Sequence, residues 1–101
     1  MAGNRIEIWG RLIGEPELRI TPAGTAILRF AMEFGPQSGE STMAVLMTGE
    51  AAQVLLSELK AAANVRVSGS LKPIRRRLKS GMFETGYEVM AESIKLEESQ
   101  N

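Results

Sequence analysis

The stretch TMAVLMTGEAAQVLLSELKAAANVRVSGS, Thr42–Ser70, decides the fold because its hydrophobic period changes twice. Residues 42–48 alternate between apolar and polar side chains, as residues 65–71 do again, and this period of two is typical of β-strands. The intervening residues 50–64 are rich in strong helix formers and carry apolar side chains at helical spacing, namely Ala51, Val54, Leu55 and Leu59. The segment therefore predicts a strand, one helix and another strand.

Two further strands are predicted before this segment. Residues 4–13 alternate, with Ile6 and Ile8 facing one way, and Gly10 marks a bend or bulge. Residues 14–24 contain prolines and glycines that indicate an irregular connection, which ends in a tight turn at residues 21–24. Residues 25–34 alternate again and form the second strand, followed by a polar loop.

A fifth strand is predicted after the segment. Lys79-Ser80-Gly81 is a hairpin turn signal, and residues 83–96 alternate beyond it. Three strands, a helix and a two-strand hairpin are the order of an OB-fold, a five-stranded Greek-key barrel with a helix between strands three and four. We therefore predict an all-β fold with one helix, as a single domain over residues 1–101, with its core at about residues 4–98 and a short frayed C-terminal end.

Composition excludes several functional classes. The 101 residues contain no cysteine and no histidine, which removes the usual nucleophile, general base and metal ligands. There is no phosphate-cradling glycine motif, no signal-peptide layout and no apolar run of about 18 residues that could span a membrane. We therefore expect no enzyme, catalytic residue, metal, cofactor or membrane partner, and a cytoplasmic location.

Charge is divided unevenly along the chain. Residues 60–83 hold seven cations and no acid, whereas the rest holds twelve acids and five cations. We predict one basic face on an acidic body, with Glu84, Glu88 and Glu92 as a solvated strand edge. The candidate nucleic-acid-binding residues are Arg66, Lys72, Arg75, Arg76, Arg77, Lys79, Phe83 and Tyr87. The alternatives are a solvated hairpin tip for the arginines and packing for Phe83 and Tyr87.

The N-terminal residues also carry a family pattern. Asn4, Gly10, Leu12, Pro16, Glu17, Arg19, Thr21, Pro22 and Gly24 match the opening of bacterial single-stranded-DNA-binding proteins, which the chain resembles from about residue 4 to residue 98. The resemblance implies an OB-fold that binds single-stranded DNA. It also places Thr42 and Thr48 at strand-three positions, and Arg76 at a loop position, where the family usually has base-stacking aromatics. We therefore expect binding led by charge, with Arg76 in part replacing a stacking ring.

The family usually ends in a long tail with an acidic tip, whereas this chain stops almost at the end of its fifth predicted strand. In this respect the chain resembles the tailless group of primosomal replication protein N. That group implies a role in DNA replication restart and primosome assembly, a homodimer, and a replication helicase or another replication protein as partner. The alternatives are a divergent plasmid or phage single-strand binder, an adaptor with weak DNA affinity, and an RNA or oligosaccharide binder.

Because members of the family dimerise through the first strand, the resemblance assigns Arg5, Glu7 and Trp9 to a dimer interface. Two alternatives remain open for Trp9, which are packing at a barrel end and stacking on DNA.

Overall fold

The computed structural model describes residues 3–35 and 41–97, which form a closed five-stranded barrel with one short helix. The elements are β1 (Ile6–Ile20), β2 (Ala26–Phe34), β3 (Ser41–Thr48), α1 (Glu50–Leu56), β4 (Asn64–Arg77) and β5 (Phe83–Glu97). The strands follow the order β1-β2-β3-β5-β4 around the barrel, and only the β3–β5 pair is parallel. This arrangement confirms the predicted OB-fold.

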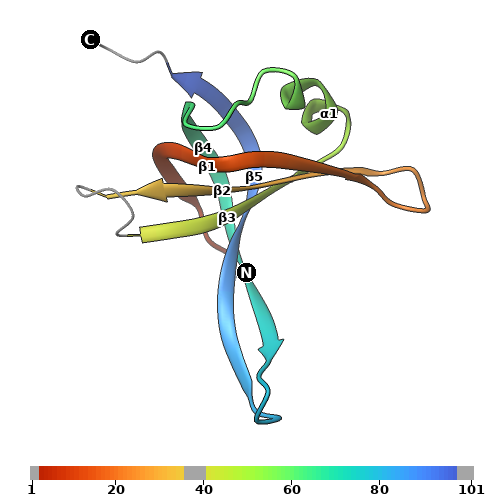
Figure 1. Ribbon diagram of the computed structural model, residues 1–101, viewed down its shortest axis with the longest axis vertical. Coiled ribbons are helices and arrows are strands. Elements are labelled where there is room, and N and C mark those ends of the chain that lie inside the picture. Colours follow the sequence, from red (N-terminus) through yellow and green to blue (C-terminus); the bar gives the residue numbers. More distant parts are fainter. Residues whose placement is uncertain (1–2, 36–40, 98–101) are drawn as a thin grey trace.

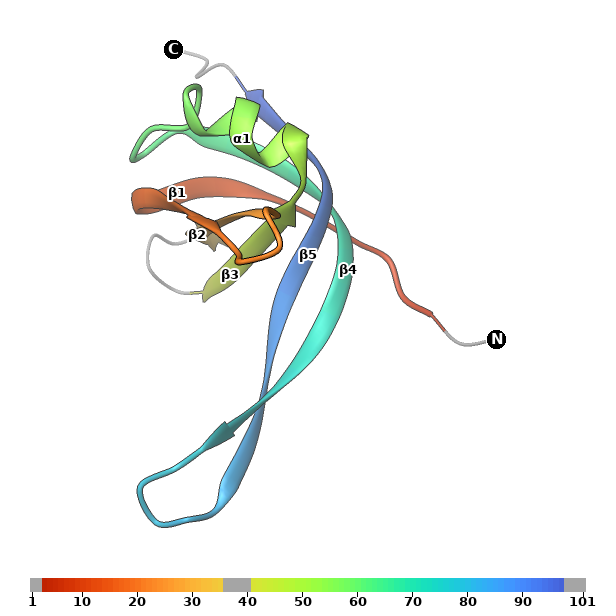
Figure 2. The same cartoon turned by 90° about the vertical axis from the view of Figure 1, so that its right-hand side faces the viewer.

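The helix covers one end of the barrel, and the outer part of the β4–β5 hairpin projects from the other end (Figures 1 and 2). The barrel interior is filled by apolar side chains from all five strands, with Ala52 added from α1 and Leu59 from the residues that follow it. Leu28, Met32, Val45 and Val89 are fully buried. The projecting part of the hairpin contributes no residue to this core, so its side chains can contact a ligand without loss of core packing.

The prediction that β1 ends near Ile13 is wrong. The strand continues to Ile20 because it changes partners: residues 6–11 pair with β4, and residues 11–20 pair with β2. The register shifts between Ile13 and Glu17, a bulge that accommodates Gly14 at a φ of 72° and Pro16, which has no N–H to donate. The bulge that the sequence predicts at Gly10 instead lies between Ile13 and Glu17, and Gly10 is a point of close approach: a Cβ there would stand 2.0 Å from the carbonyl oxygen of Glu33.

The predicted helix is too long. The structure ends α1 at Leu56 rather than near residue 64, because the next residues bond to β1. The N–H of Ala62 donates to the carbonyl of Leu12, and the N–H of Leu12 donates to the carbonyl of Ala63. These bonds draw the chain out of the helical path despite its alanine-rich composition, a case in which tertiary contacts override propensity. The inward face is also carried by Ala52 instead of the predicted Ala51 and Val54, which are exposed.

One carboxylate of the expected solvated edge is buried. Glu88 is only 8% exposed, while Glu84 and Glu92 are exposed as predicted. Nη1 of Arg29 on β2 donates a hydrogen bond of 2.8 Å to Oε2 of Glu88 on β5. Because β3 lies between these two strands, this ion pair braces the barrel where the β3–β5 ladder closes it.

The expected frayed end at residues 98–101 and most of the expected polar loop after β2 lie outside the described residues. Within the ranges that the structure describes, no helix is both long and apolar enough to cross a membrane.

Candidate nucleic-acid interface

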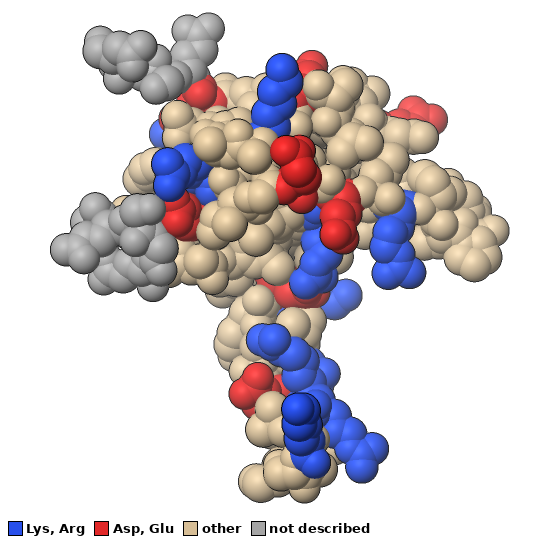
Figure 3. All heavy atoms as spheres, in the orientation of Figure 1, with Lys and Arg blue, Asp and Glu red and all other residues tan. Residues whose placement is uncertain are grey.

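The β4–β5 hairpin brings seven of the eight predicted nucleic-acid-binding residues together. Its register runs from Lys72 opposite Glu88 to Arg77 opposite Phe83. A turn at residues 78–82 joins the strands, with Gly81 at a φ of 89° and its N–H donating to the carbonyl of Leu78. Lys and Arg side chains gather on this projecting hairpin, whereas both signs of charge are mixed over the barrel (Figure 3).

The register divides the hairpin into two faces of different chemistry. Residues directly opposite each other in an antiparallel pair share a face, and successive residues alternate. Arg75 opposite Thr85, Arg77 opposite Phe83, and Pro73 opposite Tyr87 therefore share one face, which contains no acid. We call this the arginine–aromatic face: Pro73, Arg75, Arg77, Phe83, Thr85 and Tyr87.

The arginine–aromatic face continues the inward side of the barrel wall. Two residues further toward the barrel along each strand, the same face carries Leu71 opposite Val89, and both pack in or against the core. Beyond the barrel this side has no partner strand among the described residues, so its aromatic rings are exposed. Phe83 is 51% and Tyr87 55% exposed, which rules out their packing into the core.

Arg75 makes a cation–π contact with a ring of this face. Its guanidinium carbon lies 4.2 Å from the centre of the Phe83 ring, within the range of a cation–π contact. Phe83 and Tyr87 are four residues apart, a distance of roughly 13 Å at about 3.3 Å per residue. The face therefore offers two exposed rings with two arginines beside them, an arrangement suited to a polymer that carries both flat bases and negative phosphates.

The opposite face of the hairpin is less suited to an anion. Arg76 faces Glu84 there, with Nε of the arginine 3.9 Å from Oε1 of the glutamate. A Cβ on Gly86 would stand 3.0 Å from Nη2 of Arg76, so the arginine side chain extends over that glycine. Lys72 shares this face and lies opposite Glu88. Arg76 therefore lies on the face opposite to Phe83 and Tyr87. If it stacks on a base, as expected, it does so apart from these two rings.

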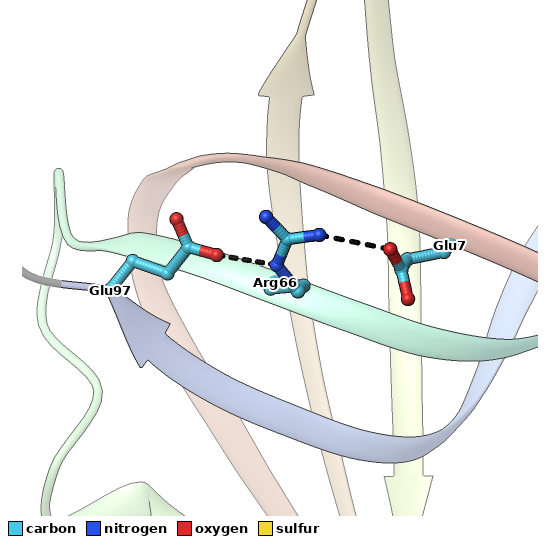
Figure 4. A network of polar contacts seen from close by, with 3 residues as sticks. All are labelled: Glu7, Arg66 and Glu97. Carbon is cyan, nitrogen blue, oxygen red and sulfur yellow. Dashed lines mark hydrogen bonds and ion pairs between the residues drawn. The ribbon is translucent and has the colours of Figure 1, made fainter.

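Arg66 is the predicted residue that the structure does not bring to the hairpin tip. It lies on the barrel part of β4, where Nη1 donates to Glu7 at 2.9 Å and Nε donates to Glu97 at 2.6 Å (Figure 4). The hydrogen bond to Glu97 and the charge of that carboxylate raise the pKa of Arg66, with a smaller contribution from Glu7. Arg66 is therefore fixed as a positive charge between two negative ones.

The same cluster contains two residues of the expected dimer interface. Trp9 lies opposite Arg66 in the β1–β4 ladder, and the guanidinium carbon is 4.9 Å from the ring centre. Trp9 is 57% exposed, so it does not close the barrel end by packing. Arg5 precedes β1 and is exposed. Trp9 and Glu7 thus stand on the outer side of β1, away from the hairpin tip.

A groove of about 700 Å³ runs beside this part of β1. Its lining includes Glu7, Trp9, Arg11, Glu33, Phe34 and Asn64. Its lining holds two carboxylates and one arginine: Arg11 donates to Glu33, and Glu7 accepts from Arg66 outside the lining. This excess of acid contrasts with the acid-free arginine–aromatic face and makes the groove a poor site for a run of phosphates.

Sequence reasoning missed that Thr85 shares a face with Phe83 and Tyr87, although the alternation of the strand was a sufficient signal. On β3, Thr42 and Thr48 are both exposed. No group of three or more Asp or Glu side chains among residues 3–35 and 41–97 is arranged to hold a metal ion.

The barrel and the projecting hairpin define the class of protein: an OB-fold, in which the loop between strands four and five is one of the recurrent ligand sites. The family model described as "Single-strand binding protein family" matches residues 3–97, and the chain belongs to that family. No curated protein sequence matches the chain. A solved structure from Plasmodium falciparum, "SSB complex with ssDNA", is similar with a TM-score of 0.79, 17% identity and 97% of each chain covered. At this identity the likeness confirms the fold alone.

Proposed function

We propose that the chain binds single-stranded DNA without sequence preference, and that the arginine–aromatic face is its main contact. The observation that carries the proposal is the segregation of Arg75, Arg77, Phe83 and Tyr87 onto one acid-free face of a projecting hairpin. Membership of the single-strand binding protein family and the likeness to a complex with single-stranded DNA support it.

The aromatic residues would bind the bases, and the arginines would bind the phosphates. Bases that stack on exposed aromatics contribute about 1–3 kcal/mol each, a magnitude known from single-strand binders of this same fold. Arginines pair with phosphate oxygens and release condensed counterions, so affinity falls as salt rises. Two exposed rings and a few cations predict weaker, more salt-dependent binding than a surface with many rings.

The test is fluorescence anisotropy of labelled oligo-dT titrated with the protein across a salt series. We expect tight binding at low salt and a steep linear fall of log affinity with log salt concentration. A neutral protein of similar size serves as the control. Binding of oligo-dT no stronger than that of the control at low salt would refute the proposal. Binding of an RNA oligomer more tightly than oligo-dT would indicate that the ligand is RNA.

We further propose a cellular role in replication restart and primosome assembly, as a cytoplasmic homodimer of the primosomal replication protein N type that contacts a replication helicase. The open edge of β1 supports the dimer: residues 6–10 pair with β4 alone among the described strands. An unpaired strand edge accepts a second strand readily. Co-purification with a replication helicase and loss of restart in a deletion strain would test the role.

A second function is favoured by one observation. β3 presents Thr42 and Thr48 where stacking rings would extend a DNA track, while the groove beside Trp9, with two carboxylates and one arginine in its lining, suits a protein surface better than phosphates. The alternative is therefore an adaptor of a replication complex with weak DNA affinity. Helicase binding that persists when oligo-dT binding is absent would favour the adaptor over the DNA binder.

A further inference from the structure

The tip of the β4–β5 hairpin carries two exposed apolar side chains that the proposed DNA contact does not use. Leu78 is 41% and Met82 69% exposed, at the end of the segment that projects furthest from the barrel (Figure 2). Hairpin turns are normally polar, and residues 79–81 of this one, Lys-Ser-Gly, follow that rule. The two apolar residues flank the polar turn and form what we call the apolar tip.

The apolar tip is held in a defined geometry. The N–H of Leu78 donates to the carbonyl of Met82 at 2.7 Å, which sets the two residues opposite each other. The N–H of Met82 lies 3.4 Å from Oγ of Ser80, and Gly81 supplies the positive φ that closes the turn. The side chains are therefore presented together on an ordered hairpin end.

The surroundings of the apolar tip indicate the chemistry of its partner. Arg77 and Lys79 flank Leu78 in the chain, and Phe83 follows Met82, so cations and a ring of the arginine–aromatic face adjoin the tip. By the same alternation, Leu78 and Met82 lie on the side of Arg76 and Glu84. A nucleic-acid strand that follows the arginine–aromatic face outward from Tyr87 to Phe83 therefore meets them where it crosses the end of the hairpin. Aliphatic side chains are poor platforms for a single base, but Leu and Met are among the residues that wedge against stacked base pairs.

We propose that the apolar tip packs against the outermost base pair where a single strand meets a duplex, so that the protein prefers such junctions. The terminal pair of a duplex has one face without a stacking neighbour, and Leu78 and Met82 would cover it while the arginine–aromatic face holds the adjoining single strand. The junction preference rests on the proposed binding of single-stranded DNA and adds a second ligand element to it.

The test compares the Kd for a duplex with a single-stranded dT tail with the Kd for the dT tail alone. The wild-type protein should bind the tailed duplex about tenfold more tightly. The double variant Leu78→Ser/Met82→Ser should bind both DNAs equally, with oligo-dT affinity within about twofold of wild type. The control, Val54→Ser/Leu96→Ser, removes apolar side chains of similar exposure, 65% and 42%, from other surfaces and should keep the preference.

Each other outcome has a distinct meaning. Absence of a preference in the wild-type protein, or a preference that survives in the Leu78→Ser/Met82→Ser variant, overturns the junction site while leaving the proposed function intact. Failure to bind oligo-dT at all overturns the proposed function as well. Anionic phospholipid vesicles form a further arm: vesicle binding that depends on the tip, without a tip-dependent junction preference, would assign the apolar tip to a membrane surface instead.

Discussion

At the scale of single residues, Glu88 is the one buried carboxylate among the described residues. It is 8% exposed and bonded to Arg29 across the barrel seam, so Glu88→Gln removes a charge that has a partner. Because Arg29 is itself about half exposed, we expect a loss of only about 1 kcal/mol in the free energy of unfolding. Urea unfolding monitored by circular dichroism measures it.

The matched control for Glu88→Gln is Glu84→Gln on the same strand. Glu84 is exposed and lies 3.9 Å from Arg76, so its replacement should change stability by less than about 0.5 kcal/mol. Equal losses in the two variants would show that the Arg29–Glu88 pair does not brace the seam.

Gly10 supports a second prediction at this scale. A Cβ at residue 10 would stand 2.0 Å from a backbone oxygen of Glu33, and backbone cannot yield as a side chain can. Gly10→Ala should therefore destabilise the protein by about 2 kcal/mol or more. Gly3→Ala, where nothing lies within 4 Å, is the control and should leave the unfolding midpoint unchanged. A Gly10→Ala variant as stable as wild type would contradict the close approach of β1 to β2.

At the scale of elements, the two faces of the β4–β5 hairpin should differ in phosphate contact. Arg77 lies on the arginine–aromatic face, whereas Arg76 faces Glu84 on the other side. Arg77→Gln should lower the slope of log affinity against log salt by about 0.7, the value of one phosphate on a single strand. Arg76→Gln should leave the slope nearly unchanged. Oligo-dT titrations at several salt concentrations measure both, and equal slope changes would refute the assignment of DNA to one face.

The elements also show what the sequence can and cannot predict. Strands with clean alternation, β2 to β5, and the start of α1 follow from local periodicity. The full length of β1 does not, because Gly14 and Pro16 signal a break locally while a bulge absorbs them in the barrel. The end of α1 depends on bonds from residues 62 and 63 to Leu12, fifty residues away in the chain.

The candidate site also has one part that follows from local sequence and one part that depends on contacts between strands. The hairpin and its basic residues follow from the alternation and from the Lys79-Ser80-Gly81 turn signal. Which arginine shares a face with which ring depends on the cross-strand register, and that register is fixed by the five residues of the turn. Alternation on one strand separates Arg76 from Arg75 and Arg77, but only pairing across the turn places Phe83 opposite Arg77 rather than Arg76.

At the scale of the whole molecule, the two surfaces lie on different parts of the fold. The hairpin holds cations and rings, and the outer side of β1 holds Trp9 beside Arg66 and its two carboxylate partners. If β1 is the dimer contact, Trp9 is the side chain expected to contribute most, because exposed tryptophans dominate interface energies at about 2 kcal/mol or more. Trp9→Ala should then weaken the dimer by at least about thirtyfold. Light scattering after size exclusion over a concentration series measures the monomer fraction.

The control for Trp9→Ala is Ile20→Ala, at a residue that is 55% exposed at the far end of the same strand and should leave the dimer intact. Oligo-dT binding provides the second readout. The outer part of the hairpin projects away from the barrel, and Trp9 lies in the barrel part of the β1–β4 ladder. The monomeric variant should therefore keep the salt slope of one hairpin while losing the gain in affinity from two linked sites. Two results would contradict a dimer contact through β1: a wild-type protein that is monomeric at every concentration, or a Trp9→Ala dimer as tight as wild type. The open edge of β1 would then be a candidate contact for a different protein.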